Sequence, residues 1–214
     1  PVVVLADADL EKAADAATLA AYACAGQWCT STSRAVVEEK IYDDFIELLL
    51  ERVKKIKVGR GTDPQTTMGP VCGKTQLQNI LAGIEKGKTE GAKLLIGGYQ
   101  IKERNLANGC FIAPTIFTDV KPDMSIAQEE IFGPVLSVIK VKDFNESVEI
   151  ANHVKFGLSS SVYTNDLQKA LTFVEKTDVG LTHVNIPTAF KEPQLRLGGV
   201  KLSGCGLPET GDTG

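Results

Sequence analysis

Residues 2–38, VVVLADADLEKAADAATLAAYACAGQWCTSTSRAVVE, decide the fold of this 214-residue chain. Residues 2–5 are a short, continuous apolar run, which predicts a buried strand. Asp7 and Asp9 then predict the N-cap of an alanine-rich helix from residue 10 to about residue 25. A second strand is predicted over residues 34–38. This order of strand, helix and strand indicates two parallel strands joined by a helical crossover.

The same alternation of strands and amphipathic helices continues to residue 185. Further strands are predicted over residues 93–96, 109–117, 134–141, 158–164 and 180–185, and further helices over residues 41–56, 75–88, 145–152 and 166–176. Residues 59–70 and 196–214 are predicted to be loops because they are rich in glycine and other turn residues. The pattern predicts an α/β domain of three αβα layers with a mostly parallel sheet.

Composition argues against several classes of protein. The chain is 43% hydrophobic and 23% charged, as in a globular domain, and its net charge of −4 comes from interleaved acids and bases. No nucleic-acid or membrane partner is therefore expected, and no apolar run approaches the ~20 residues of a membrane span. Five widely spaced cysteines without a CxxC pair predict free thiols in a reducing compartment, with cytoplasm the first choice and a mitochondrial matrix left open.

Familiar cofactor and metal motifs are absent from the sequence. Neither GxGxxG after a strand nor GxxxxGK[ST] occurs, so no pyrophosphate-binding loop is predicted. His153 and His183 are the only histidines and lie far apart, which gives no support to a metal site or a histidine-based triad.

One cysteine stands in a segment suited to chemistry, GQWCTSTSR at residues 26–34. Cys29 is predicted on a turn after the first long helix, where a partly exposed thiol could act as a nucleophile. From spacing alone, a small apolar core residue is the better interpretation of any single cysteine. Cys24 is predicted to lie in the core, and Trp28 and Thr30 either pack or line a substrate tunnel.

This segment resembles the cysteine signature of the aldehyde dehydrogenase superfamily. Four more stretches resemble that family in the same order: VVVLADADL at 2–10, QEEIFGPV at 128–135, NHVKFGLSSSVYT at 152–164 and LGGVKLSGCGLPETG at 197–211. The resemblance covers residues 1–214 and implies a cysteine-bearing catalytic domain, with the dinucleotide-binding domain outside this chain. Within the family, residues 183–201 look most like 2-oxoglutarate-semialdehyde (2,5-dioxopentanoate) dehydrogenases.

The resemblance implies that the Cys29 thiolate attacks a small-molecule aldehyde to give a thiohemiacetal. Hydride would pass to NAD or NADP, and water would hydrolyse the resulting thioester to a carboxylic acid. Glu130 would accept hydrogen bonds from the ribose beside the nicotinamide, and Phe132 would pack against that ribose and ring. The alternatives are a solvated acidic turn for Glu129 and Glu130, and a core aromatic for Phe132. His183 either edges the substrate pocket, by resemblance, or is a packing or surface histidine.

The same resemblance places Pro1 just after the segment that carries the family's general base. This glutamate, and the asparagine that gives a second oxyanion donor, are then expected outside the chain, so the fragment alone is predicted to be inactive. The full-length parent is expected to be a homodimer or homotetramer. Two alternatives stay open: a catalytically silent binding or structural relative, and a reductive relative that uses acyl-CoA or acyl phosphate.

Overall fold

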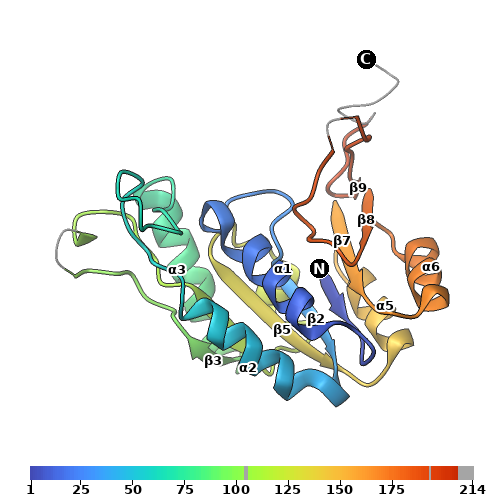
Figure 1. Cartoon of the computed structure of the whole chain (residues 1–214). Helices are drawn as coiled ribbons and strands as arrows, with labels where there is room; N and C mark the ends of the chain where they lie inside the picture. Colours follow the sequence, from blue (N-terminus) through green and yellow to red (C-terminus); the bar gives the residue numbers. More distant parts are fainter. Residues whose placement is uncertain (104–105, 193, 207–214) are drawn as a thin grey trace.

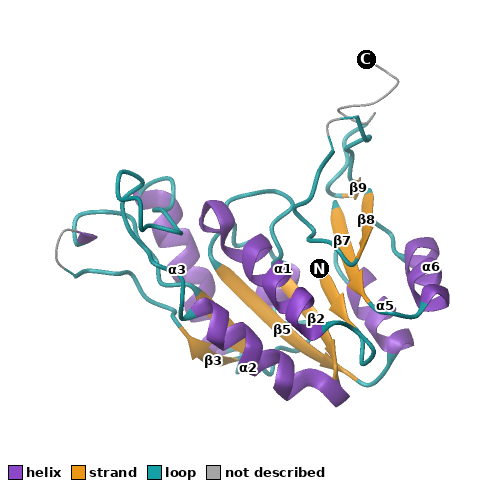
Figure 2. Cartoon of the chain, viewed as in Figure 1, coloured by secondary structure: helices purple, strands orange, loops and turns teal. Residues whose placement is uncertain are grey.

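The computed structural model describes residues 1–103, 106–192 and 194–206. Its centre is a seven-stranded sheet in the order β3-β4-β5-β2-β1-β7-β8, parallel throughout except for β3, which pairs antiparallel with β4 (Figure 2). The strands are β1 (Val2–Val4), β2 (Arg34–Glu38), β3 (Lys93–Ile96), β4 (Thr115–Thr118), β5 (Val135–Val141), β7 (Ser159–Tyr163) and β8 (Leu181–Val184). The apolar run at the start of the chain thus becomes an inner strand, with Val2, Val3 and Val4 buried.

Helices cover both faces of this sheet. Figure 1 shows α1 and α2 in front of the strands and α5 behind them. The helices are α1 (Leu10–Tyr22), α2 (Tyr42–Val53), α3 (Lys74–Thr89), α4 (Ser125–Gln128), α5 (Phe144–Asn152) and α6 (Leu167–Lys176). The predicted three-layer α/β fold with a mostly parallel sheet is confirmed. No helix within the described residues is long and apolar enough to cross a membrane.

Local capping explains where several helices begin. The carboxylate of Asp9 accepts a hydrogen bond from Lys12 N at the start of α1, and Asp166 accepts from Gln168 N and Lys169 N at the start of α6. Such bonds satisfy backbone donors that have no partner within the helix. The predicted N-terminus of α1 is therefore correct.

The end of α1 differs from the prediction. The helix stops at Tyr22, and Cys24, Ala25 and Gly26 follow with φ angles of 53°, 56° and 68°. Because this left-handed turn takes the chain away from the helix, Cys24 is exposed, and its predicted place in the core is wrong. The chain then folds back, and Thr32 N donates to Ala20 O (3.1 Å).

Two other segments also depart from expectation. The strand predicted over residues 109–117 covers only Thr115–Thr118, because Pro114 has no N–H to donate to a ladder. The tail predicted as loop contains β9 (Val200–Lys201), which pairs antiparallel with β6 (Phe156–Gly157). The remainder of that prediction, residues 207–214, lies outside the described residues.

Asp7 joins the ends of two neighbouring strands. Its carboxylate accepts hydrogen bonds from Thr164 Oγ1 and Asn165 N, both at 2.7 Å, and lies 3.4 Å from Lys169 Nζ. Partial burial opposes ionisation of Asp7, but these hydrogen bonds and the lysine charge outweigh it and lower its pKa. The turn after β1 is thereby tied to the turn after β7.

Candidate functional site

The loop between α1 and β2 presents Cys29 to solvent. Cys29 is a free, exposed cysteine, so the interpretation as a core residue is wrong. Ser31 N donates to Trp28 O (2.9 Å), which closes the predicted turn around the thiol. An accessible thiol on a tight turn is available for nucleophilic attack.

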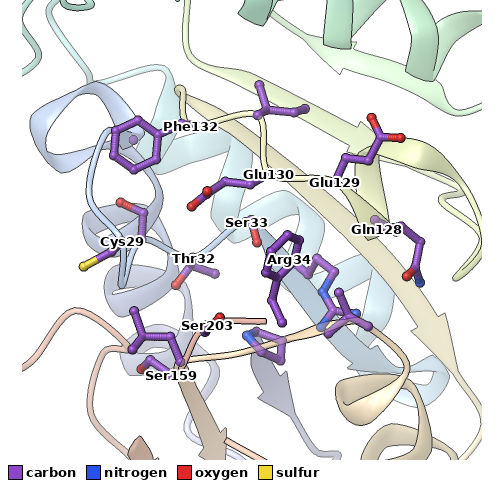
Figure 3. A pocket seen from close by; sticks show the side chains of 18 of the residues that line it. Cys29, Thr32, Ser33, Arg34, Gln128, Glu129, Glu130, Phe132, Ser159 and Ser203 are labelled. Carbon is purple, nitrogen blue, oxygen red and sulfur yellow. The ribbon is translucent and has the colours of Figure 1, made fainter. Parts of the chain in front are cut away.

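Cys29, Glu130 and Phe132 line one cavity of about 310 Å³. Figure 3 shows the Glu130 side chain directed toward the side of the cavity that holds Cys29 and Phe132, whereas Glu129 points away. Segments that begin β1, β2, β5 and β7 also line the cavity, so it lies at the amino-terminal edge of the parallel sheet. Cys29 is therefore brought together with Glu130 and Phe132, which lie far from it in the sequence.

The two adjacent glutamates have different surroundings. Glu129 Oε1 lies 2.9 Å from Lys86 Nζ in an exposed ion pair. Glu130 forms no ion pair with another residue in the described part of the chain, and its carboxylate lines the cavity. Of this acidic pair, only Glu130 has its carboxylate free to bind a ligand.

Phe132 is unusual in both exposure and backbone conformation. Its side chain is 37% exposed on the cavity wall, so the interpretation as a core aromatic is wrong. Its φ is 55°, in the left-handed region that costs a non-glycine residue roughly 1–2 kcal/mol. Backbone strain of this kind persists only where neighbouring groups hold it in place.

Hydrogen bonds made by hydroxyl groups connect the loop that carries Cys29 to residues 159 and 188. Thr188 Oγ1 donates to Thr30 O (2.8 Å) and lies 2.8 Å from Thr32 Oγ1. Since the Thr188 proton goes to Thr30, the Thr32 hydroxyl donates to Thr188. Ser159 Oγ in turn donates to Thr188 O (2.8 Å). Thr30 thus packs, whereas Trp28 is 44% exposed and lines the cavity.

Arg34 brings a positive charge to the wall of the cavity. It is 3% exposed, and its guanidinium donates to Ile150 O (3.2 Å) and Ala151 O (3.1 Å). Burial lowers the pKa of Arg34 to about 10. Because this pKa is still well above 7, the guanidinium stays charged at neutral pH.

His183 lies away from Cys29. It lines a separate cavity of about 240 Å³ beside β8, and partial burial lowers its pKa, because burial disfavours the charged ring. Of the two interpretations of this residue, packing agrees with its position.

The sequence prediction assigned no role to two glutamines at the site, Gln27 within the cysteine segment and Gln76 in α3. Gln27 Nε2 donates to Cys24 O (3.1 Å), and Gln27 Oε1 accepts from Cys72 N (2.8 Å). Gln76 Nε2 donates to Ile131 O (3.1 Å) and Phe132 O (2.9 Å). Gln27 is part of the cysteine motif, but its bond to Cys72 N spans 45 positions and the bond of Gln76 to Phe132 O spans 56, so no local pattern predicts these two bonds.

The chain is similar to known proteins over its whole length. A family model described as the aldehyde dehydrogenase family matches residues 1–214. The chain therefore belongs to the aldehyde dehydrogenase family, as the cysteine and QEEIFGPV motifs indicate.

One relative is the alpha-ketoglutaric semialdehyde dehydrogenase of Bacillus subtilis (strain 168), which is 46% identical over 212 residues. The match covers 99% of this chain and 43% of that protein. The resemblance to semialdehyde dehydrogenases is thus confirmed, and the chain spans less than half the length of this curated relative.

Two solved structures share the fold closely. The NAD-dependent aldehyde dehydrogenase from Sinorhizobium meliloti has a TM-score of 0.92 at 39% identity, covering 98% of this chain and 41% of that one. A mutant betaine aldehyde dehydrogenase from Staphylococcus aureus, solved in complex with NAD+ and with a BME-modified cysteine, has a TM-score of 0.95 at 36% identity. That match covers 99% of this chain and 43% of that one.

Proposed function

We propose that residues 1–214 are the cysteine-bearing catalytic domain of an NAD(P)-dependent aldehyde dehydrogenase that oxidises an aldehyde to a carboxylic acid. The observation that carries the proposal is the shared cavity of Cys29, Glu130 and Phe132. The family membership of the chain supports it.

Cys29 is the nucleophile in this proposal. Its thiolate sulfur forms a bond to the aldehyde carbon, and the carbonyl electron pair moves to oxygen to give a tetrahedral oxyanion. The backbone N–H of Cys29 donates no hydrogen bond to another described residue and is free to stabilise that oxyanion. The later thioester on Cys29 is hydrolysed by water to the acid.

Glu130 and Phe132 fit a nicotinamide nucleotide. When bound, NAD(P) supplies the acceptor for the hydride that leaves the substrate carbon. The Glu130 carboxylate, which forms no ion pair with another described residue, can accept two hydrogen bonds from the vicinal hydroxyls of a ribose. The exposed face of Phe132 offers an apolar surface for the ribose and ring.

The substrate proposed is a small semialdehyde of the 2-oxoglutarate-semialdehyde type. The named relative at 46% identity supports this choice. We also propose that the full-length protein is a homodimer or homotetramer. A cytoplasmic location stays a prediction from the cysteine pattern.

The deciding experiment uses the full-length protein with a panel of semialdehydes and either NAD or NADP. Cys29→Ser should abolish NAD(P)H production, because a serine hydroxyl without a paired base is a poor nucleophile. Cys205→Ser, an exposed cysteine outside the cavity, should retain the wild-type rate. If Cys29→Ser kept more than a few per cent of the rate, the assignment of the nucleophile would be wrong.

The same protein separates the two alternative functions. A catalytically silent relative would give neither turnover nor cofactor-dependent protection of Cys29 from iodoacetamide. A reductive relative would consume acyl-CoA or acyl phosphate with NAD(P)H and would form little free acid from an aldehyde.

A further inference from the structure

Helix α3 contacts both ends of the segment that carries Glu130. Near its amino end, Gln76 Nε2 bonds the carbonyls of Ile131 and Phe132. Near its carboxyl end, Lys86 pairs with Glu129. The segment is therefore held on each side of Glu130, while the Glu130 carboxylate itself is left for the cavity.

The packing of α3 against this segment leaves little room for displacement. A Cβ atom added on Gly133 would lie 2.6 Å from Ile80 Cδ1, and one added on Gly83 would lie 3.3 Å from Ile131 Cγ1. The backbone of residues 131–133 thus lies directly on the helix surface.

Phe132 needs a partner to hold its conformation. A phenylalanine at φ 55° has a higher energy than one in the extended or helical regions, and it relaxes unless a contact prevents it. The Gln76 side chain donates to the carbonyl of Ile131, just before the Phe132 nitrogen, and to the carbonyl of Phe132 itself. It therefore contacts the backbone on both sides of the Phe132 α-carbon.

We propose that Gln76 is a positioning residue, which holds Phe132 in its left-handed conformation and so sets where Phe132 and Glu130 stand relative to Cys29. The inference rests on the proposed function of the site. Gln27 extends the same support to the cysteine loop, since its amide bonds Cys72 N in the segment that leads into α3.

The first measurement needs no cofactor and follows backbone amide hydrogen exchange in the full-length protein. In Gln76→Met, the peptide that spans residues 128–134 should exchange faster than in the wild type. Gln78→Met, an exposed glutamine on the same helix, is the matched control and should leave that exchange unchanged. Equal exchange in the wild type and Gln76→Met would overturn the inference.

The second measurement is the dissociation constant for NAD(P), followed by quenching of cofactor fluorescence. Loss of two hydrogen bonds in Gln76→Met should weaken binding about five- to tenfold, and Gln78→Met should bind as the wild type does. In a Phe132→Gly background, glycine adopts a positive φ at little cost. Gln76→Met should therefore raise the dissociation constant for NAD(P) by less than about twofold in that background. An effect of equal size in both backgrounds would show that Gln76 does not act through Phe132.

A third variant covers the case in which Gln76→Met does not fold. Gln76→Glu keeps the shape of the side chain but has no donor when ionised, so cofactor binding should improve relative to wild type as pH falls toward about 5. A ratio of the two dissociation constants, Gln76→Glu to wild type, that does not change with pH would contradict the inference. A wild-type protein that binds no NAD(P) would overturn the proposed function instead, and hydrogen exchange would still decide the role of Gln76.

Discussion

A Cβ atom on Gly26 would lie only 2.1 Å from the carbonyl oxygen of Gly133. Gly26 precedes Cys29 by three positions and Gly133 follows Glu130 by three, so the two loops of the proposed site touch through their backbones. Gly26 also has a φ of 68°, which glycine adopts readily. Both the space and the backbone angle therefore require glycine at this position.

Gly26→Ala is expected to damage the site and the fold together. The added methyl group overlaps the Gly133 carbonyl and disfavours the left-handed turn, which should lower the free energy of unfolding by at least about 2 kcal/mol. Urea unfolding and the rate of Cys29 alkylation measure the two effects. Gly61→Ala is the control, because a Cβ atom there meets nothing within 4 Å. If Gly26→Ala and Gly61→Ala had similar free energies of unfolding, the close approach of Gly26 to Gly133 would not be needed for stability.

Glu130→Gln in the full-length protein should weaken cofactor binding by about 1–2 kcal/mol, because the amide accepts a hydrogen bond without charge assistance. If Glu130 also orients the nicotinamide, kcat should fall at saturating cofactor, and the isotope effect with deuterated aldehyde should increase. Glu175→Gln, an exposed glutamate on α6, controls for the loss of charge. If cofactor binding, kcat and the isotope effect were all unchanged in Glu130→Gln, this residue would not belong to the site.

The 214-residue chain expressed by itself should oxidise no aldehyde. It spans 43% of its semialdehyde dehydrogenase relative, and we propose that a general base and a second oxyanion donor are supplied by the remainder of the full-length protein. Loss of one such donor alone costs about 10²–10³ in rate. Alkylation of Cys29 in the same sample would verify that the thiol is reactive. Steady NAD(P)H production by the isolated chain would contradict the prediction.

Asp7 should contribute to stability in a pH-dependent way. Its pKa is lowered in the folded protein, so the folded state binds fewer protons than the unfolded state, and the contribution is present above the ordinary aspartate pKa of about 3.9. It is lost as pH falls further, through the folded-state pKa. Asp7→Asn should therefore lower the free energy of unfolding by about 1 kcal/mol at pH 7.

Urea unfolding of the wild type and Asp7→Asn at pH 7 and at about pH 3 tests this dependence. The difference between the two proteins should shrink at the lower pH. Asp123→Asn, at an exposed position, is the control. A difference that stays constant between the two pH values would show that the charge of Asp7 does not stabilise the fold.

The sequence by itself determined the elements whose causes are local. An apolar run of four residues marked β1, and Asp7 and Asp9 marked the start of α1. These features depend on side-chain periodicity and on hydrogen bonds that span two or three residues. Cys29, Glu130 and Phe132 were also proposed as site residues from the sequence, because each stands within a segment that resembles a family motif.

Only the tertiary structure decided how those residues meet and which neighbours support them. Cys24 lies on a left-handed turn instead of the predicted helix, and Phe132 lies on a cavity wall. The amides of Gln27 and Gln76 act across 45 and 56 positions. Such contacts depend on the strand order of the sheet, which brings distant segments together, so neither propensity nor periodicity in a short window contains them.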